Sequence, residues 1–106
     1  MNDLYEALII KEDNNTCEIK IQFSDETHPV FQVHFPGNSL LPGFLQIDII
    51  SDVLSKKVLA IKKAKFLNPI VPNDTIIFHV KTKENQIGVL TKRDDQKCSE
   101  FTFVTE

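Results

Sequence analysis

Residues 34–48 read HFPGNSLLPGFLQID and carry the most unusual chemistry of this 106-residue chain. The segment places His34 and Asp48 around two Pro-Gly corners, directly before an apolar helical pattern. A histidine titrates near neutrality and can move protons, and a carboxyl group can serve as its partner acid. Because most of the remaining chain alternates as ordinary sheet, these two side chains are the candidate catalytic residues.

The composition is that of one folded domain, with 42% hydrophobic and 25% charged residues. A chain of this length builds one core, so residues 1–106 are expected to form a single domain. The net charge of −3 argues against nucleic-acid binding. No apolar run is long enough to cross a membrane, and the N-terminus lacks the layout of a signal peptide. We therefore expect a cytoplasmic protein with free thiols at Cys17 and Cys98.

Alternating patterns predict two strands before the central segment, at residues 4–10 and 16–23, joined by a polar turn. Residues 30–33 are expected to be an extended approach to His34. A helix should begin near Pro42, where the missing N–H costs nothing, and end near Lys57. The apolar face of that helix comprises Ile47, Ile49, Ile50, Val53 and Leu54.

Further strands are predicted after the helix, at residues 58–66, 75–83, 87–92 and 97–105, with residues 58–61 as a buried run. One helix on an antiparallel sheet leaves the sheet edges open and its faces only partly covered. The pattern therefore indicates an α+β domain. A curved antiparallel sheet around one helix, with a second subunit covering the remaining surface, satisfies these demands.

Two segments resemble the beta-hydroxyacyl-ACP dehydratases of the hot-dog fold. Residues 34–48 are similar to the family pattern His-Phe-x-Gly-x-Pro-Val-Met-Pro-Gly-x-Leu-x-x-Glu/Asp, and residues 61–74 look like Lys-x-Arg-Phe-x-x-Pro-Val-x-Pro-Gly-Asp. The resemblance implies a hot-dog fold and dehydration of 3-hydroxyacyl thioesters to trans-2-enoyl thioesters. It places the reaction in fatty-acid or related lipid or polyketide biosynthesis, with no cofactor and no metal.

The resemblance also implies roles for three residues. His34 would abstract the C2 proton, and Asp48 would help the C3 hydroxyl leave as water. The backbone N–H of Gly43, expected in the first turn of the helix, would stabilise the charge on the thioester oxygen. In relatives the histidine and the acid come from different subunits, so the implied site exists only in a homodimer or a higher oligomer.

The predicted acyl-binding residues are Phe35, Leu41, Phe44, Ile49 and Phe66. Ile49 stands where relatives often carry alanine, and its bulk predicts a preference for short or medium acyl chains. The phenylalanines are also open to a plain interpretation as core residues.

Five lysines within ten positions predict a docking surface for an acidic acyl carrier protein: Lys56, Lys57, Lys62, Lys63 and Lys65. The alternative is a solvated face of snorkelling lysines. A coenzyme A thioester is the alternative form of the substrate.

Two other functions stay open at this stage. The first is thioester hydrolysis, with Asp48 as base or nucleophile. The second is a non-catalytic acyl-binding or assembly module that keeps the fold. Its support comes from Val33, which replaces the family's glycine before the histidine, and from Asp52, which stands where many relatives carry glutamine.

Overall fold

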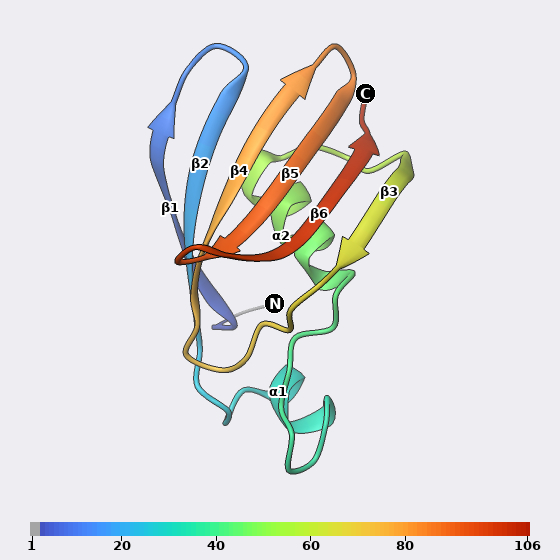
Figure 1. The fold of residues 1–106 in the computed structure, drawn as a ribbon. Coiled ribbons are helices and arrows are strands. Elements are labelled where there is room, and N and C mark those ends of the chain that lie inside the picture. The colour runs from blue at the N-terminus through green and yellow to red at the C-terminus, as the bar shows by residue number, and fades with distance from the viewer. Residues whose placement is uncertain (1–2) are drawn as a thin grey trace.

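The computed structural model describes residues 3–106, which form a six-stranded antiparallel sheet and two helices (Figure 1). The strands are β1 (Tyr5–Glu12), β2 (Thr16–Phe23), β3 (Ala60–Phe66), β4 (Thr75–Lys83), β5 (Gln86–Arg93) and β6 (Gln96–Val104). They lie in the order β1-β2-β4-β5-β6-β3, so β1 and β3 are the two open edges. The predicted polar turns connect β1 to β2, β4 to β5 and β5 to β6.

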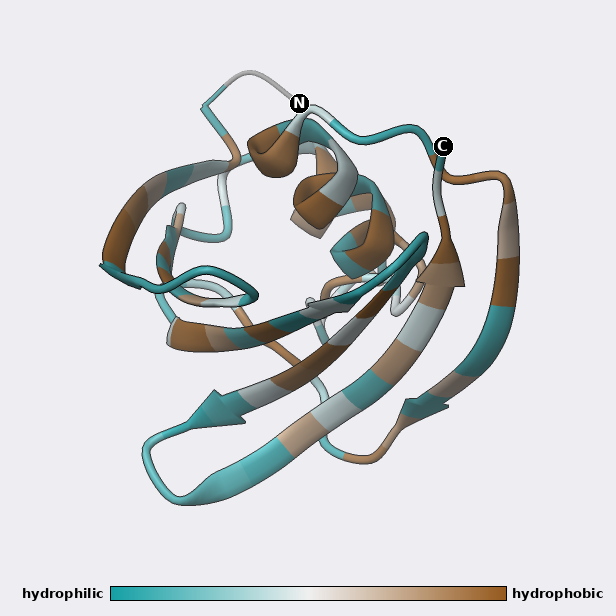
Figure 2. Ribbon diagram, turned by 90° about the horizontal axis from the view of Figure 1, so that it is seen from above, coloured by the Kyte–Doolittle hydropathy of each residue, from teal (hydrophilic) through white to brown (hydrophobic). Residues whose placement is uncertain are grey.

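The sheet curves around the helix α2 (Leu45–Leu54), as Figures 1 and 2 show from two directions. The predicted apolar face of the helix is confirmed, since Ile47, Ile49 and Ile50 are buried and Val53 and Leu54 are half-buried. The alternating strand residues Ile76, Phe78 and Val80 face the same core. The predicted α+β architecture, one helix within a curved antiparallel sheet, is therefore confirmed. Within residues 3–106, no helix is long and apolar enough to cross a membrane.

Helix α2 ends earlier than predicted, at Leu54 instead of near Lys57. Ser55 adopts the left-handed conformation, with φ of 54°. Its N–H donates to the carbonyl of Asp52, and the N–H of Lys56 donates to the carbonyl of Ser51 at 3.0 Å. These two bonds form a Schellman motif, which satisfies the last carbonyls of the helix and stops it.

The helix also begins later than predicted, at Leu45 instead of near Pro42. Pro42 and Gly43 lie in a lead-in turn, where their carbonyls accept from Leu45 and Gln46 at 3.0 Å each. The side chain of Gln46 is buried and accepts a hydrogen bond from Ser99 Oγ of β6 at 2.5 Å. This buried pair fixes the first turn of α2 on the sheet.

The prediction of an extended segment at residues 30–33 is wrong. Residues Pro29–Val33 form a short helix, α1, that buries Phe31. His28 caps it, because its Nδ1 accepts from the N–H of Val30 at 3.1 Å, and Pro29 takes the first helical position. Proline is favoured at that position because its fixed φ suits a helix.

Strand β3 was predicted correctly, but the prediction that residues 58–61 form a buried run is wrong. All seven residues of β3 are exposed, and the side chain of Ile61 is 53% exposed. The physical reason is position, since β3 is an edge strand that pairs only with β6. The edge therefore carries apolar side chains on the surface of the single chain.

Candidate active site

Three hydrogen bonds, two of them to the same Val30 oxygen, hold His34 at the end of α1. Its backbone N–H donates to the carbonyl of Val30 at 3.2 Å, and its own carbonyl accepts from the N–H of Leu40 at 2.7 Å. Its ring nitrogen Nδ1 lies 3.0 Å from the same Val30 oxygen. The half-buried imidazole is thus fixed in place by the backbone around it.

These contacts determine which ring nitrogen of His34 is basic. A backbone carbonyl only accepts hydrogen bonds, so Nδ1 must carry the proton in its contact with Val30. The neutral ring then has its lone pair on Nε2. Nε2 contacts no hydrogen-bond partner among residues 3–106. The geometry therefore makes Nε2 the atom that can accept a proton.

The loop after His34 closes on itself through a tight turn. The N–H of Asn38 donates to the carbonyl of Phe35 at 2.9 Å, and the N–H of Phe35 donates to the carbonyl of Asn38 at 3.1 Å. Gly37 has φ of 77°, as the third residue of a type II turn requires, and Pro36 precedes it. This Pro-Gly corner turns the chain back so that Leu40 can bond His34.

Asp48 lies in the first turn of α2, where the helix dipole favours a carboxylate. Its side chain is exposed and makes no hydrogen bond or ion pair with the described part of the chain. No contact joins it to His34, and α1 lies beyond the end of the sheet, apart from α2 (Figure 1). One chain alone therefore does not bring the two predicted catalytic side chains together.

Gly43 lies in the turn before α2, not in the first helical turn as predicted. Its φ is not positive, so a left-handed backbone conformation explains glycine at Gly37 but not at Gly43. A Cβ added to Gly43 would lie only 2.8 Å from atoms of the Phe66 ring. Its N–H donates to no acceptor within residues 3–106. Close packing against Phe66 is the reason for glycine here.

The structure divides the predicted acyl-binding residues into two groups. Phe35, Phe44 and Phe66 are 53%, 64% and 45% exposed, so their interpretation as core residues is wrong. Leu41 and Ile49 belong to the core of the single chain. Their roles in binding substrate stay predictions.

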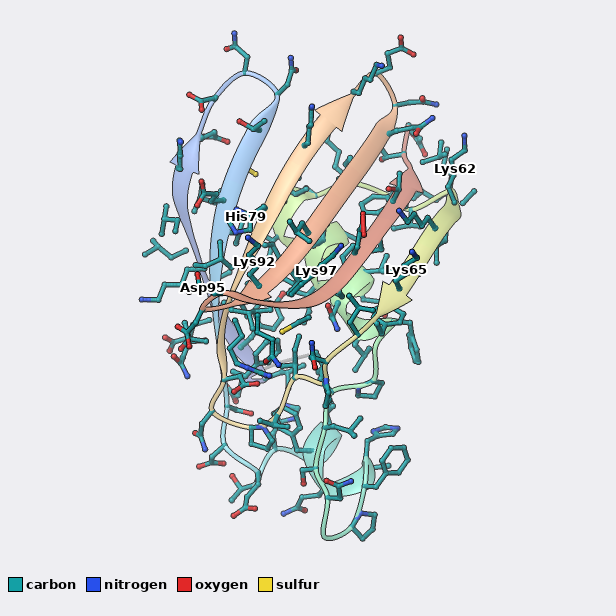
Figure 3. The ribbon with its side chains drawn as sticks, viewed as in Figure 1. Lys62, Lys65, His79, Lys92, Asp95 and Lys97 are labelled. Carbon is teal, nitrogen blue, oxygen red and sulfur yellow. The ribbon has the colours of Figure 1, made fainter. Side chains whose placement is uncertain are left out.

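All five lysines of the predicted docking surface are exposed. Figure 3 shows Lys62 and Lys65 along β3, near Lys97 of β6. Lys63 is engaged by Glu100 at 3.3 Å, and Lys97 approaches the same carboxylate at 2.8 Å. Hydrogen bonds from Lys97 and Lys63 hold the pKa of Glu100 below its usual value. Part of the basic surface is therefore neutralised locally.

A set of hydrogen bonds centred on Arg93, called the Arg93 brace below, was not predicted from the sequence. Its Nη1 donates to the Asp74 carboxylate at 2.5 Å and to the carbonyl of Pro69 at 3.0 Å. The loop held in this way offers the carbonyl of Ile70 to the N–H of Leu41 at 2.8 Å. Arg93 is the chain's single arginine, and this single occurrence is the feature of the sequence that could have indicated a special role. The brace links β5 to the loop that leads from His34 into α2.

The two departures that supported a non-catalytic module have particular surroundings. Asp52 Oδ2 accepts a hydrogen bond from the Tyr5 hydroxyl at 2.9 Å, which ties β1 to α2. Burial, followed by this hydrogen bond, raises the pKa of Tyr5 to about 12. The side chain of Val33 is exposed. Asp52 therefore has a structural partner within the chain.

Sequence comparisons identify relatives over most of the chain. The profile of the ApeI-like dehydratase family (ApeI dehydratase) matches residues 9–102. The 3-hydroxyacyl-[acyl-carrier-protein] dehydratase FabZ of Fusobacterium nucleatum subsp. nucleatum is 35% identical over 117 aligned positions, covering 93% of this chain and 77% of that enzyme. FabZ of Rhizobium rhizogenes is 31% identical over 97 positions, covering 79% of this chain. The chain spans 61% of the length of that second enzyme.

Solved structures share the fold. The dehydratase heterocomplex ApeI:P from Xenorhabdus doucetiae aligns with a TM-score of 0.77 and 24% identity, covering 94% of this chain and 97% of the other. A hypothetical thioesterase of Streptococcus pneumoniae aligns with a TM-score of 0.60 and 13% identity, covering 94% of this chain and 88% of the other. These likenesses confirm the predicted hot-dog fold.

Proposed function

Because this chain belongs to the ApeI-like dehydratase family, we propose that it converts 3-hydroxyacyl thioesters to trans-2-enoyl thioesters. The FabZ relatives are named 3-hydroxyacyl-[acyl-carrier-protein] dehydratases, which supports this substrate class. The reaction would serve fatty-acid or related lipid or polyketide biosynthesis. The observation that carries the proposal is the contact of His34 Nδ1 with Val30, which leaves Nε2 as a free base. The two free thiols, Cys17 and Cys98, support a cytoplasmic location.

The proposed reaction uses one base, one acid and one N–H donor. Nε2 of His34 takes the C2 proton, and the electron pair of the broken C–H bond forms the C2–C3 double bond. The C3–O bond breaks, and Asp48 delivers a proton to the departing hydroxyl, which leaves as water. The N–H of Gly43 stabilises negative charge on the thioester oxygen. Return of the proton from His34 to Asp48 completes the cycle.

A homodimer is the proposed working unit, because one chain does not bring His34 and Asp48 together. Strand β3 offers an open edge, with Leu59, Ile61 and Leu67 exposed on or beside it. Apolar side chains on an unpaired edge favour association with another chain. The solved ApeI belongs to a dehydratase heterocomplex, so a different chain is the alternative partner subunit.

Mixing two inactive variants tests both the chemistry and the shared site. His34→Ala and Asp48→Asn chains should each lose turnover, measured by the absorbance of the enoyl product. If each site takes its histidine and its acid from different subunits, a mixed dimer regains one intact site of its two. Equal amounts, refolded together, should recover about one quarter of the wild-type activity, since half of the dimers are mixed. Two inactive variants that recover no activity on mixing would contradict the shared site.

The acyl chain and its carrier are proposed from surface properties. The exposed rings of Phe35, Phe44 and Phe66 offer an apolar surface to the acyl chain. Ile49 and Leu41 lie in the core, and the bulk of Ile49 at a position where relatives often carry alanine supports short or medium acyl chains. Turnover on substrates from four to sixteen carbons tests this, and a preference for fourteen carbons or more would contradict it. The docking surface Lys56, Lys57, Lys62, Lys63 and Lys65 supports acyl carrier protein as the carrier.

Charge reversal separates the two carriers. Lys62→Glu with Lys65→Glu should raise KM for an acyl-carrier-protein substrate and leave KM for the matching coenzyme A substrate unchanged. Lys81→Glu with Lys83→Glu, which reverses two exposed lysines on β4, is the matched control. An equal effect on both carriers would count against the docking surface. Release of free thiol without an enoyl product would instead identify a thioesterase, and binding without turnover an acyl-binding module.

A further inference from the structure

Phe66 and Gly43 come from distant parts of the sequence but pack directly against each other. Phe66 is the last residue of β3, and Gly43 lies in the turn before α2. A Cβ on Gly43 would approach Cγ, Cδ1 and Cδ2 of the ring to between 2.8 and 2.9 Å. These atoms are at the base of the ring, so a small rotation of its far end would not relieve the overlap. The ring therefore acts as a wall against the Gly43 backbone.

We propose that Phe66 is a positioning residue, which fixes the N–H of Gly43 for the thioester oxygen. This inference rests on the proposed function and assigns Phe66 a second role beyond contact with the acyl chain. An N–H donor lowers the barrier only when it points to the place where negative charge develops. Displacement of such a group by about 1 Å can cost about 100-fold in rate.

The peptide group that carries the N–H of Gly43 is restrained in two ways. Its carbonyl, that of Pro42, accepts from the N–H of Leu45 at 3.0 Å, and because a peptide group is planar this bond also directs the N–H. The Gly43 N–H itself has no acceptor within residues 3–106, so it stays available. The Phe66 ring packs directly against the Gly43 backbone and adds a second restraint on the position of this peptide group.

The strand that carries the ring is itself held firmly. Phe66 pairs with Ser99 of β6, and the N–H of Leu67 donates to the carbonyl of Cys98 at 2.8 Å. The amide side chain of Asn68 donates to the carbonyl of Lys97 at 2.7 Å. The Phe66 side chain is 45% exposed despite its contact with Gly43, so the ring also has a surface available to a substrate.

The test separates positioning from substrate binding through kcat and KM. Phe66→Ala should lower kcat by about 10- to 100-fold, because the N–H of Gly43 is displaced, and any rise in KM beside it measures the lost acyl contact. Phe66→Tyr keeps the wall and should keep kcat. Phe44→Ala removes another exposed ring of the predicted acyl surface and should act mainly on KM. A Phe66→Ala enzyme with unchanged kcat and raised KM would overturn the proposal, because the ring would then be only a substrate contact.

A double-mutant cycle checks the packing independently of catalysis. Gly43→Ala should lower the thermal midpoint because its methyl group overlaps the ring, and combination with Phe66→Ala should relieve part of that loss. If Gly43→Ala keeps the wild-type thermal midpoint while Phe66 is present, the proposed close packing of the ring on Gly43 is wrong. If the wild type dehydrates no thioester, the proposed function fails and the positioning role fails with it. Wild-type dehydration with a normal kcat in Phe66→Ala refutes the positioning role alone.

Discussion

The proposed proton transfer depends on single residues. His34 receives its tautomer from Val30, and Asp48 is exposed in the first helical turn. Both were predicted from the sequence because their spacing follows the dehydratase pattern. The Arg93 brace and the buried Gln46–Ser99 pair were not predicted. Each joins residues that lie far apart in the chain, and no local pattern reports such a contact.

Replacement of His34 by alanine should abolish most of the turnover. General acid–base catalysis contributes about 10²- to 10⁴-fold, so kcat should fall by about that factor. His79→Ala is the matched control, because His79 is half-buried in β4 beside Glu18, 3.8 Å away and outside the proposed site. Steady-state kinetics and light scattering measure turnover and assembly. Near wild-type turnover in His34→Ala would remove the base from the mechanism.

The raised pKa of Tyr5 predicts a loss of stability at high pH. Tyrosine is neutral when protonated, and the pKa of Tyr5 is about 12 in the fold against 10.0 for an unperturbed tyrosine. The folded chain therefore holds this proton more tightly than the unfolded chain. The contribution should be present below about pH 10 and should disappear as the pH rises to about 12.

Chemical denaturation of the wild type and of Tyr5→Phe across this range measures the effect. The contributions of all other groups are shared by both proteins. The difference in unfolding free energy between the two should shrink as the pH rises. A constant difference would show that the Tyr5–Asp52 hydrogen bond does not couple to the proton.

At the scale of elements, the long alternating strands and the apolar face of α2 followed from the sequence. Their apolar side chains repeat with the period of a strand or a helix. The repeat therefore identifies the element even where its predicted first and last residues are misplaced. Helix α1 was missed because one turn is too short to show a helical period. The surface position of β3 was missed because an edge strand and a central strand share one local pattern.

Ser55 is strained where α2 ends, and glycine should relieve that strain. A left-handed conformation costs a residue with a Cβ about 1–2 kcal/mol, so Ser55→Gly should stabilise the fold by about 1 kcal/mol. Lys56→Gly, one position later and without a positive φ, should not stabilise it. Urea denaturation of both variants measures the difference. Equal effects at the two positions would rule out the left-handed cap as the cause.

At the scale of the whole molecule, two sheet edges are open but only β3 lies next to the proposed site. Ile61 on β3 and Leu8 on β1 are exposed to similar extents, 53% and 61%. Ile61→Lys should raise the Kd of the dimer by more than about tenfold, since an uncompensated interface charge costs about 2–5 kcal/mol. Turnover should fall as the dimer dissociates. Leu8→Lys should leave the Kd of the dimer and the turnover unchanged.

Sedimentation over a range of concentrations, with parallel rate measurements, tests this assignment. Dissociation by Leu8→Lys alone would move the interface to β1. Retention of the dimer in both variants would exclude the two edges as interfaces. The fold of one chain was predictable because it depends on periodic patterns within that chain. Contacts of the β3 edge with another subunit leave no such periodic pattern, so the sequence alone did not predict them.

Strand β3 has only seven residues, yet two parts of the chain and the proposed partner subunit depend on it. It hydrogen-bonds β6, it carries the ring that packs on Gly43, and it bears the apolar edge offered to a partner. Insertions, loop grafts or new chain termini should therefore be tolerated at the two-residue turn between β5 and β6, but not within residues 59–67. An engineer who wished to shorten this protein or fuse it to another would have to leave that segment intact.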